Sequence, residues 1–249
     1  MIKVKDVLNY LCGVYPLDTA CEFDNVGLLA GDGESAVTGA VVALDLDVTT
    51  LRFAKERGAN LIITHHPVIF EPLKSVTEKD LVFGLIRDGI SVISMHTNLD
   101  IGEGGVNDVL CDTLGLTDIK PYTAGDGYLL KYGVTGIDNP DRFAEFIKSK
   151  LGGAVRYVCG GKPIKTVLVC SGSGGGYISE AIAGGFDALV TADVKQHQFI
   201  EAINGGVSLF DGGHFNTENV IVEPLCNRLK KQFGDTEFTA YMPHNIKTV

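Results

Sequence analysis

The feature that most constrains the fold is a repeated alternation of short, almost continuously hydrophobic segments with helical ones. The hydrophobic segments 60–66 and 90–96 each follow an amphipathic stretch that ends in glycine, and the same order returns at 186–193 and 207–214. Strands that are apolar at nearly every position are buried on both faces, as in sheets covered by helices. The pattern predicts an α/β fold with mixed, mostly parallel sheets.

The alternation occurs twice along the chain. Residues 41–66 align without a gap with residues 168–193, and this places Thr64 on Thr191. Each half then continues to a His-x-x-x-acid segment, "HTNLD" at 96–100 and "HFNTE" at 214–218. We therefore predict an internal duplication, with one α/β repeat at 1–126 and a second at 127–249. The junction carries turn residues without a flexible linker, so we expect the halves to pack together.

Charge and cysteine content narrow the functional classes. The net charge is −10 and the pI is about 5.0, and the lysines and arginines form no cluster. Broad nucleic-acid binding and binding to anionic membranes are therefore disfavoured, whereas a small-molecule ligand is compatible with this charge. The six cysteines are scattered, which is typical of reduced thiols. No signal peptide or membrane-spanning window is found, and we expect a cytoplasmic protein.

Polar side chains gather where the predicted strands end. In open α/β sheets, ligands bind at the carboxyl ends of the strands. Imidazole and carboxylate ligands without thiolates suit Zn, Mn, Fe or Ni. A single histidine at a strand end is usually structural, but the histidine pair together with two His-x-x-x-acid segments predicts a metal site. The polar residues at these strand ends are His65, His66, His96, Asp100, Asp193, His197, His214 and Glu218.

The adjacent histidines, His65 and His66, favour two ions over one. Neighbouring side chains on a regular strand point to opposite faces, so they rarely bind the same ion. A backbone turn at Pro67 would let each histidine hold one metal of a pair, with Asp100 or Glu218 bridging them. We therefore expect two divalent metal ions per chain.

Other groups have less defined roles. Asp193 aligns with His66 and faces the same crevice, but it is equally suited to cap the helix that follows. His96 and His197 are candidate proton carriers or supports for the ligands. The glycine-rich turn "SGSGGGY" at 171–177 favours tight turning over phosphate binding, although Gly172, Ser173 and Gly174 together with Asp193 are candidate substrate contacts.

At these motifs the sequence resembles the NIF-three-like family, whose members are named GTP cyclohydrolase I type 2 homologues. The resemblance spans the whole chain through "DNVGLLAGD", "THHP", "HTNLD", "SGSGGG", "TADVKQH" and "GGHFNTE". It implies two intertwined α/β repeats, a dinuclear metal centre and a ring-shaped homohexamer. The chain has the short form of the family, without an inserted domain, and it carries Ala192 where many relatives have glycine. The metal ligands that the resemblance implies are His65, His66, Asp100, His214 and Glu218.

These features lead to a hydrolase hypothesis. Two ions would acidify a water and polarise a nucleotide or another small phosphorylated or heterocyclic substrate. An alternative function, from a different class, is that of a non-catalytic ring protein that binds a ligand or that binds or handles metal. A third reading, a phosphoesterase of the Asp-His-His type, meets Thr64 where its aspartate is required and would need Asp45 and Asp47 as support.

Overall fold

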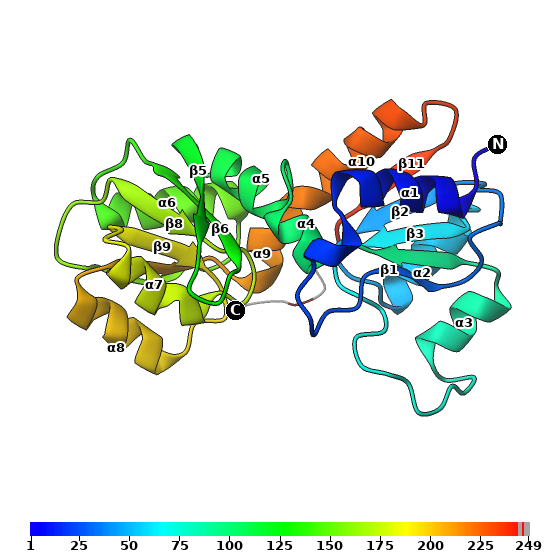
Figure 1. Ribbon diagram of the computed structural model, residues 1–249, viewed down its shortest axis with the longest axis horizontal. Coiled ribbons are helices and arrows are strands. Elements are labelled where there is room, and N and C mark those ends of the chain that lie inside the picture. Colours follow the sequence, from blue (N-terminus) through cyan, green and yellow to red (C-terminus); the bar gives the residue numbers. More distant parts are fainter. Residues whose placement is uncertain (244–245, 247–249) are drawn as a thin grey trace. The chain divides into compact units, whose positions relative to one another are not determined.

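The computed structural model describes residues 1–243 and Ile246, which form two compact units (Figure 1). The first unit comprises Met1–Glu103 with Ile221–Pro243, and the second comprises Gly104–Val220. These units divide the chain at places other than the ends of the predicted repeats, 1–126 and 127–249. The last part of the second predicted repeat, 244–245 and 247–249, lies outside the described residues.

A five-stranded sheet forms the centre of the first unit, in the order β1-β4-β3-β2-β11. β2, β3, β4 and β11 run parallel, and β1 pairs antiparallel with β4. The strands are β1 (Gly27–Ala30), β2 (Ala40–Ala43), β3 (Leu61–Thr64), β4 (Ser91–Ser94) and β11 (Phe238–Tyr241). The helices are α1 (Val4–Val14), α2 (Val48–Glu56), α3 (Leu81–Arg87), α4 (Thr97–Ile101) and α10 (Val222–Gln232).

The first sheet is covered by helices, as its apolar strands predict. Ala54 of α2 and Leu85 of α3 pack with Val41, Ile62 and Val92 of three neighbouring strands. Removing this apolar surface from water is the main force that holds such layers together. α10 packs on β2 and β11.

The second unit contains a six-stranded sheet in the order β5-β6-β8-β9-β10-β7. Its central strands β8, β9 and β10 are parallel, and the strands on both sides of them pair antiparallel. The strands are β5 (Thr117–Thr123), β6 (Leu129–Val134), β7 (Arg156–Val158), β8 (Thr166–Val169), β9 (Ala188–Thr191) and β10 (Ser208–Asp211). The helices are α5 (Val106–Thr113), α6 (Pro140–Leu151), α7 (Ile178–Ala183), α8 (Gln196–Gly205) and α9 (His214–Glu218).

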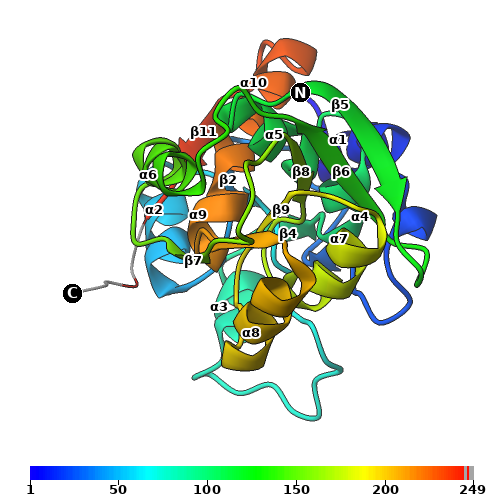
Figure 2. The same ribbon diagram turned by 90° about the vertical axis from the view of Figure 1, so that its left-hand side faces the viewer.

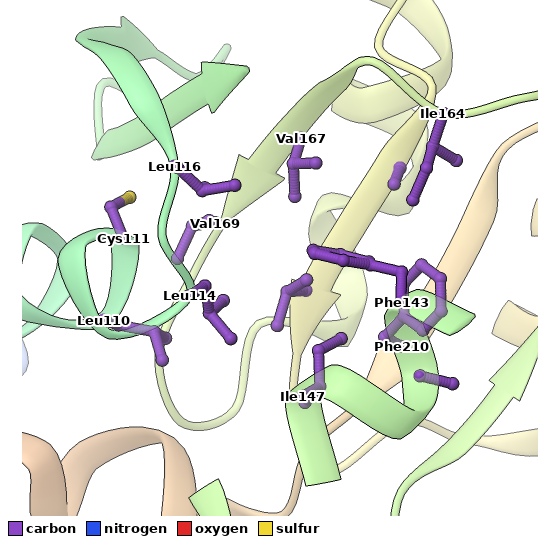
Figure 3. Close-up of a cluster of buried hydrophobic side chains, with 13 residues drawn as sticks. Leu110, Cys111, Leu114, Leu116, Phe143, Ile147, Ile164, Val167, Val169 and Phe210 are labelled. Atoms are coloured by element: carbon purple, nitrogen blue, oxygen red, sulfur yellow. The ribbon is translucent and has the colours of Figure 1, made fainter. Parts of the chain in front are cut away.

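Successive residues along a strand of the second sheet point into two separate apolar layers, one on each face of the sheet. Val167 and Val169 of β8 contact α5 and α6, with Phe143 and Ile147 of α6 at the centre of the layer (Figure 3). Leu168, between the two valines, belongs to the layer under α7 and α8, which pack side by side (Figure 2). The two-residue period of a strand explains this division.

The chain exchanges elements between the two units. β2-α2-β3-α3-β4-α4 corresponds in order to β8-α7-β9-α8-β10-α9, which agrees with the predicted intertwined repeats. α5 and β5 follow α4 in the chain but belong to the second unit, whereas α10 and β11 follow α9 but belong to the first. This exchange is the reason that the compact units differ from the sequence halves. Within the described residues, every helix is too short or too polar to cross a membrane.

Candidate metal centre

The backbone leaves regular strand geometry at the histidine pair that follows β3. The N–H groups of His65 and His66 both donate to the end of β2, to the carbonyls of Ala43 and Leu44 at 3.3 and 3.0 Å. In a regular strand, consecutive N–H groups point to opposite sides. This departure lets adjacent side chains gather, and the two imidazole ring centroids lie 4.9 Å apart.

His96 joins this pair and forms a three-histidine group. Its ring centroid lies 5.1 Å from that of His65 and 5.6 Å from that of His66. One ligand atom from each histidine lies within 4.8 Å of the others, which is a spacing that suits metal coordination. His96 was predicted as a proton carrier or a supporting residue, and the structure places it among the candidate ligands themselves.

Each of the three imidazoles is held through its Nδ1 atom. The partners are the carbonyl of Met95 at 3.0 Å for His65, Asp45 at 2.6 Å for His66 and Asp24 at 2.8 Å for His96. Metal-binding histidines are usually oriented in this way by a carbonyl or carboxylate, which leaves Nε2 as the ligand atom. The donor set of the first unit therefore fits a divalent metal ion.

Asp24 is the support for His96, and its side chain is completely buried. Burial alone would raise its pKa, but hydrogen bonds from His96 and Thr97 outweigh that effect and hold the pKa of Asp24 far below its ordinary value. Asp24 is therefore a carboxylate across the physiological pH range.

Asp100 adds a carboxylate to the first unit. It lies on α4, which begins directly after His96, and its Oδ1 atom is 3.5 Å from Nε2 of His65. Both side chains are buried, with exposed fractions of 9% for Asp100 and 1% for His65. The first unit thus brings together His65, His66 and Asp100, three of the five predicted ligands.

The second unit brings together the remaining two predicted ligands. His214 and Glu218 occupy the first and last positions of α9, and Nε2 of His214 lies 3.0 Å from Oε2 of Glu218. Asp193 accepts a hydrogen bond from Nδ1 of His214 at 2.7 Å. The carboxylate of Glu218, with a further contribution from Asp193, raises the pKa of His214 to about 9, although burial acts in the opposite direction. That all five ligands hold one pair of ions stays a prediction.

Asp193 supports His214 and does not cap the following helix. The N-cap of α8 is Lys195, so the alternative reading of Asp193 as a helix cap is wrong. Asp193 instead has a left-handed backbone with φ of 54°, which is unfavourable for a residue with a side chain. Asp211 holds the neighbouring backbone by accepting hydrogen bonds from the N–H groups of Val194 and Gly213.

The glycine-rich turn packs tightly on Glu218. Gly172 has φ of 59°, and a Cβ atom there would overlap with Oε1 of Glu218 and lie 3.4 Å from Nε2 of His214. A Cβ atom on Gly174 would likewise overlap with Cys170 and Thr191. Close packing is thus what requires these glycines. Ser173, between them, is exposed.

His197 is exposed near the start of α8. It makes no hydrogen bond or ion pair within the described part of the chain, so the structure does not join it to His214 or Asp193. Its predicted role as a proton carrier stays a prediction.

Sequence reasoning missed the supports of the histidines in the first unit. Asp45 was considered only as part of the Asp-His-His alternative, and Asp24 was not singled out. Both carried a signal, because Asp45 directly follows the apolar run 40–44 and Asp24 begins the motif "DNVGLLAGD". The carbonyl of Met95 has no signal of its own, since every residue carries one.

The fold and the two sets of candidate ligands define a class of two-unit α/β proteins whose strand-end histidines are oriented by carboxylates or a backbone carbonyl. The chain belongs to the Duf34/NIF3 (NGG1p interacting factor 3) family, whose model matches residues 2–246.

Curated relatives and solved structures support this assignment. A "GTP cyclohydrolase 1 type 2 homolog" of Clostridium perfringens is 32% identical over 95% of each chain, and one of Clostridium acetobutylicum is 33% identical over 92% of this chain and 90% of that relative. The crystal structure of a hypothetical protein from Staphylococcus aureus matches with a TM-score of 0.91 and 29% identity, over 99% of both chains.

Proposed function

We propose that this protein is a divalent-metal-dependent hydrolase that acts on a nucleotide or another small phosphorylated or heterocyclic substrate. Two ions per chain, of Zn, Mn, Fe or Ni, would be held by His65, His66, Asp100, His214 and Glu218. The name of the curated relatives, homologues of a cyclohydrolase, agrees with this class of reaction.

The orientation of four histidines carries the proposal. His65, His66, His96 and His214 each engage Nδ1 with a carbonyl or carboxylate at 2.6 to 3.0 Å. Orienting four imidazoles in the same way serves no purpose in packing a core, whereas it presents Nε2 for coordination. Asp100 and Glu218 are buried carboxylates beside these rings, with side-chain exposed fractions of 9% and 5%. Burying such charges is costly unless a cation or a hydrogen-bond donor compensates.

Bound divalent ions would supply Lewis acidity and lower the pKa of a bound water toward neutrality. The chain's own residues would then fix the geometry. Asp24, Asp45 and Asp193 hold the rings of His96, His66 and His214, and the buried carboxylates Asp100 and Glu218 balance the positive charge. His66 and His214 are partly exposed, which lets a substrate approach from solvent.

Metal analysis and a turnover screen test this proposal. Protein purified without chelator should contain about two transition ions per chain. A screen of nucleotides and phosphoesters with Mn, Fe and Zn should find turnover that Asp100→Ala abolishes while the fold is retained. Asp112→Ala, a change at an exposed carboxylate, is the matched control. Turnover that persists in Asp100→Ala would exclude a coordinating role for that residue.

A metal-handling protein is the rival function. This rival function predicts the same metal content but no turnover of any nucleotide or phosphoester in the screen. We also propose a homohexameric ring, as the resemblance implies, and sedimentation velocity on the 26.6 kDa chain measures the assembled mass directly.

A further inference from the structure

An exposed aromatic pair borders the three-histidine group of the first unit. The ring of Phe70 meets His96 edge to face, with ring centroids 6.2 Å apart and an interplanar angle of 85°. Phe23 lies next to Phe70, with centroids 6.3 Å apart and an angle of 50°. A continuous row of rings therefore runs from Phe23 through Phe70 to His96.

Both phenylalanines are unusually exposed. Phe23 is 68% exposed and Phe70 is 44% exposed, so a large part of each ring is accessible to solvent and is not buried in the core. Single exposed apolar residues need no explanation, but two aromatic rings in contact beside a polar site form an apolar surface. Ligand sites usually combine such apolar rings with a few convergent polar groups.

The two rings are positioned by a specific hydrogen bond. The side-chain amide of Asn25 donates to the carbonyl of Ile69 at 2.6 Å, and these residues lie close to Phe23 and Phe70 in the sequence. Asp24, which holds His96, lies between Phe23 and Asn25. The same short segment thus places the aromatic pair and orients a candidate metal ligand.

Phe70 belongs to a long irregular segment that starts at the histidine pair. Residues 67–80 contain no helix or strand and follow His66 directly. Irregular segments of this length in a compact unit commonly form binding loops. Leu73 and Val76 on this segment are also about half exposed, but neither carries a ring that can stack.

We propose that Phe23 and Phe70 form a stacking platform that binds a planar aromatic heterocycle, such as a purine base, beside the three-histidine group. This inference rests on the proposed function and narrows its substrate class to compounds with a flat ring. A π-surface attracts every nucleobase, because each base has a flat face and stacks on an aromatic side chain. Ribose phosphates have no such ring and would gain nothing from the platform.

Equilibrium binding to the metal-loaded protein tests the platform. The probes are guanosine and adenosine, with ribose 5-phosphate as the control that lacks an aromatic base, and binding is measured by calorimetry without turnover. We expect Phe70→Leu to weaken nucleoside binding by about 5- to 100-fold and Phe70→Trp to preserve it, with ribose 5-phosphate unaffected in both. Leu73→Ala, on the same segment, should bind nucleosides like the wild type.

Two further measurements separate this proposal from the proposed function. Metal content should be unchanged in Phe70→Leu, because Phe70 provides no ligand atom. If the wild type binds nucleosides but turns over no compound of the screen, the result supports the platform and contradicts the proposed hydrolase function. The platform is overturned if the wild type binds neither nucleoside or if Phe70→Leu binds both normally. It is also overturned if Phe70→Leu changes the sedimentation coefficient without changing nucleoside affinity, because Phe70 would then contact a second copy of the chain.

Discussion

Gly172 lies directly against the carboxylate of Glu218, so closely that a Cβ atom at residue 172 would overlap with Oε1. The backbone N–H of Gly172 also donates to Thr217, the residue before Glu218, at 3.1 Å. The glycine-rich turn and α9 therefore fix each other, and the position of the candidate ligand Glu218 depends on the missing side chain of Gly172.

Gly172→Ala should displace Glu218 and reduce metal binding by the second unit. The substituted residue would also be strained at φ of 59°, so we expect a loss of about 1–3 kcal/mol in the free energy of unfolding. Gly176→Ala, in the same turn but facing open space, is the control for both measurements. Full metal stoichiometry in Gly172→Ala would contradict the dependence of Glu218 on Gly172.

Asp24→Asn should weaken metal binding by the first unit. The amide keeps the shape of the side chain but removes the charge that orients His96, and the loss of such a support typically costs 10- to 100-fold in metal affinity. Competition with a colorimetric chelator measures this change. Asp18→Asn, at an exposed position on a neighbouring segment, should leave the affinity unaltered. Equal affinities for the two variants would show that Asp24 has only a structural role.

Asp193→Gly and Asp193→Ala separate backbone strain from ligand support. Both variants remove the carboxylate that holds His214 and should lose metal affinity to a similar extent. Only glycine adopts the left-handed backbone without strain. The free energy of unfolding of Asp193→Gly should therefore be about 1 kcal/mol higher than that of Asp193→Ala. Urea denaturation of the two metal-free variants measures the difference. Identical unfolding curves would mean that residue 193 stores no strain.

Asp187 should contribute stability that is lost in acid. Burial raises the pKa of Asp187, but hydrogen bonds from Thr166 and the ion pair with Lys162 outweigh this and lower the pKa to about 2. Because the folded-state pKa lies below that of the unfolded chain, the stabilisation is complete above the ordinary carboxyl pKa and is lost progressively as the pH falls through about 2. Asp187→Asn should therefore lose about 1–2 kcal/mol at pH 7 and clearly less at pH 2.5, where part of the stabilisation has been lost.

Urea unfolding at the two pH values tests this expectation. Asp112→Asn, at an exposed position, provides the control and should match the wild type at both. A deficit for Asp187→Asn that is as large at pH 2.5 as at pH 7 would exclude the proposed electrostatic origin.

The sequence by itself determined the α/β class, the order of the elements and the residue types of the candidate metal centre. Local patterns suffice for these properties, because buried strands are apolar at nearly every position and helices repeat their apolar residues every three or four positions. The His-x-x-x-acid segments at 96–100 and 214–218 also show the same short helix after equivalent strands.

Only the tertiary structure decided which unit each terminal element of a repeat joins and which groups hold the histidines. α5 and α10 have similar amphipathic patterns, and nothing local to them specifies which sheet they cover. The hydrogen bonds that His96 donates to Asp24 and that His214 donates to Asp193 join residues far apart in the chain. Such contacts depend on how strands pair and how helices pack on the sheets. The free energy that favours this arrangement is summed over many residues of the packed layers, so no short stretch of sequence determines it.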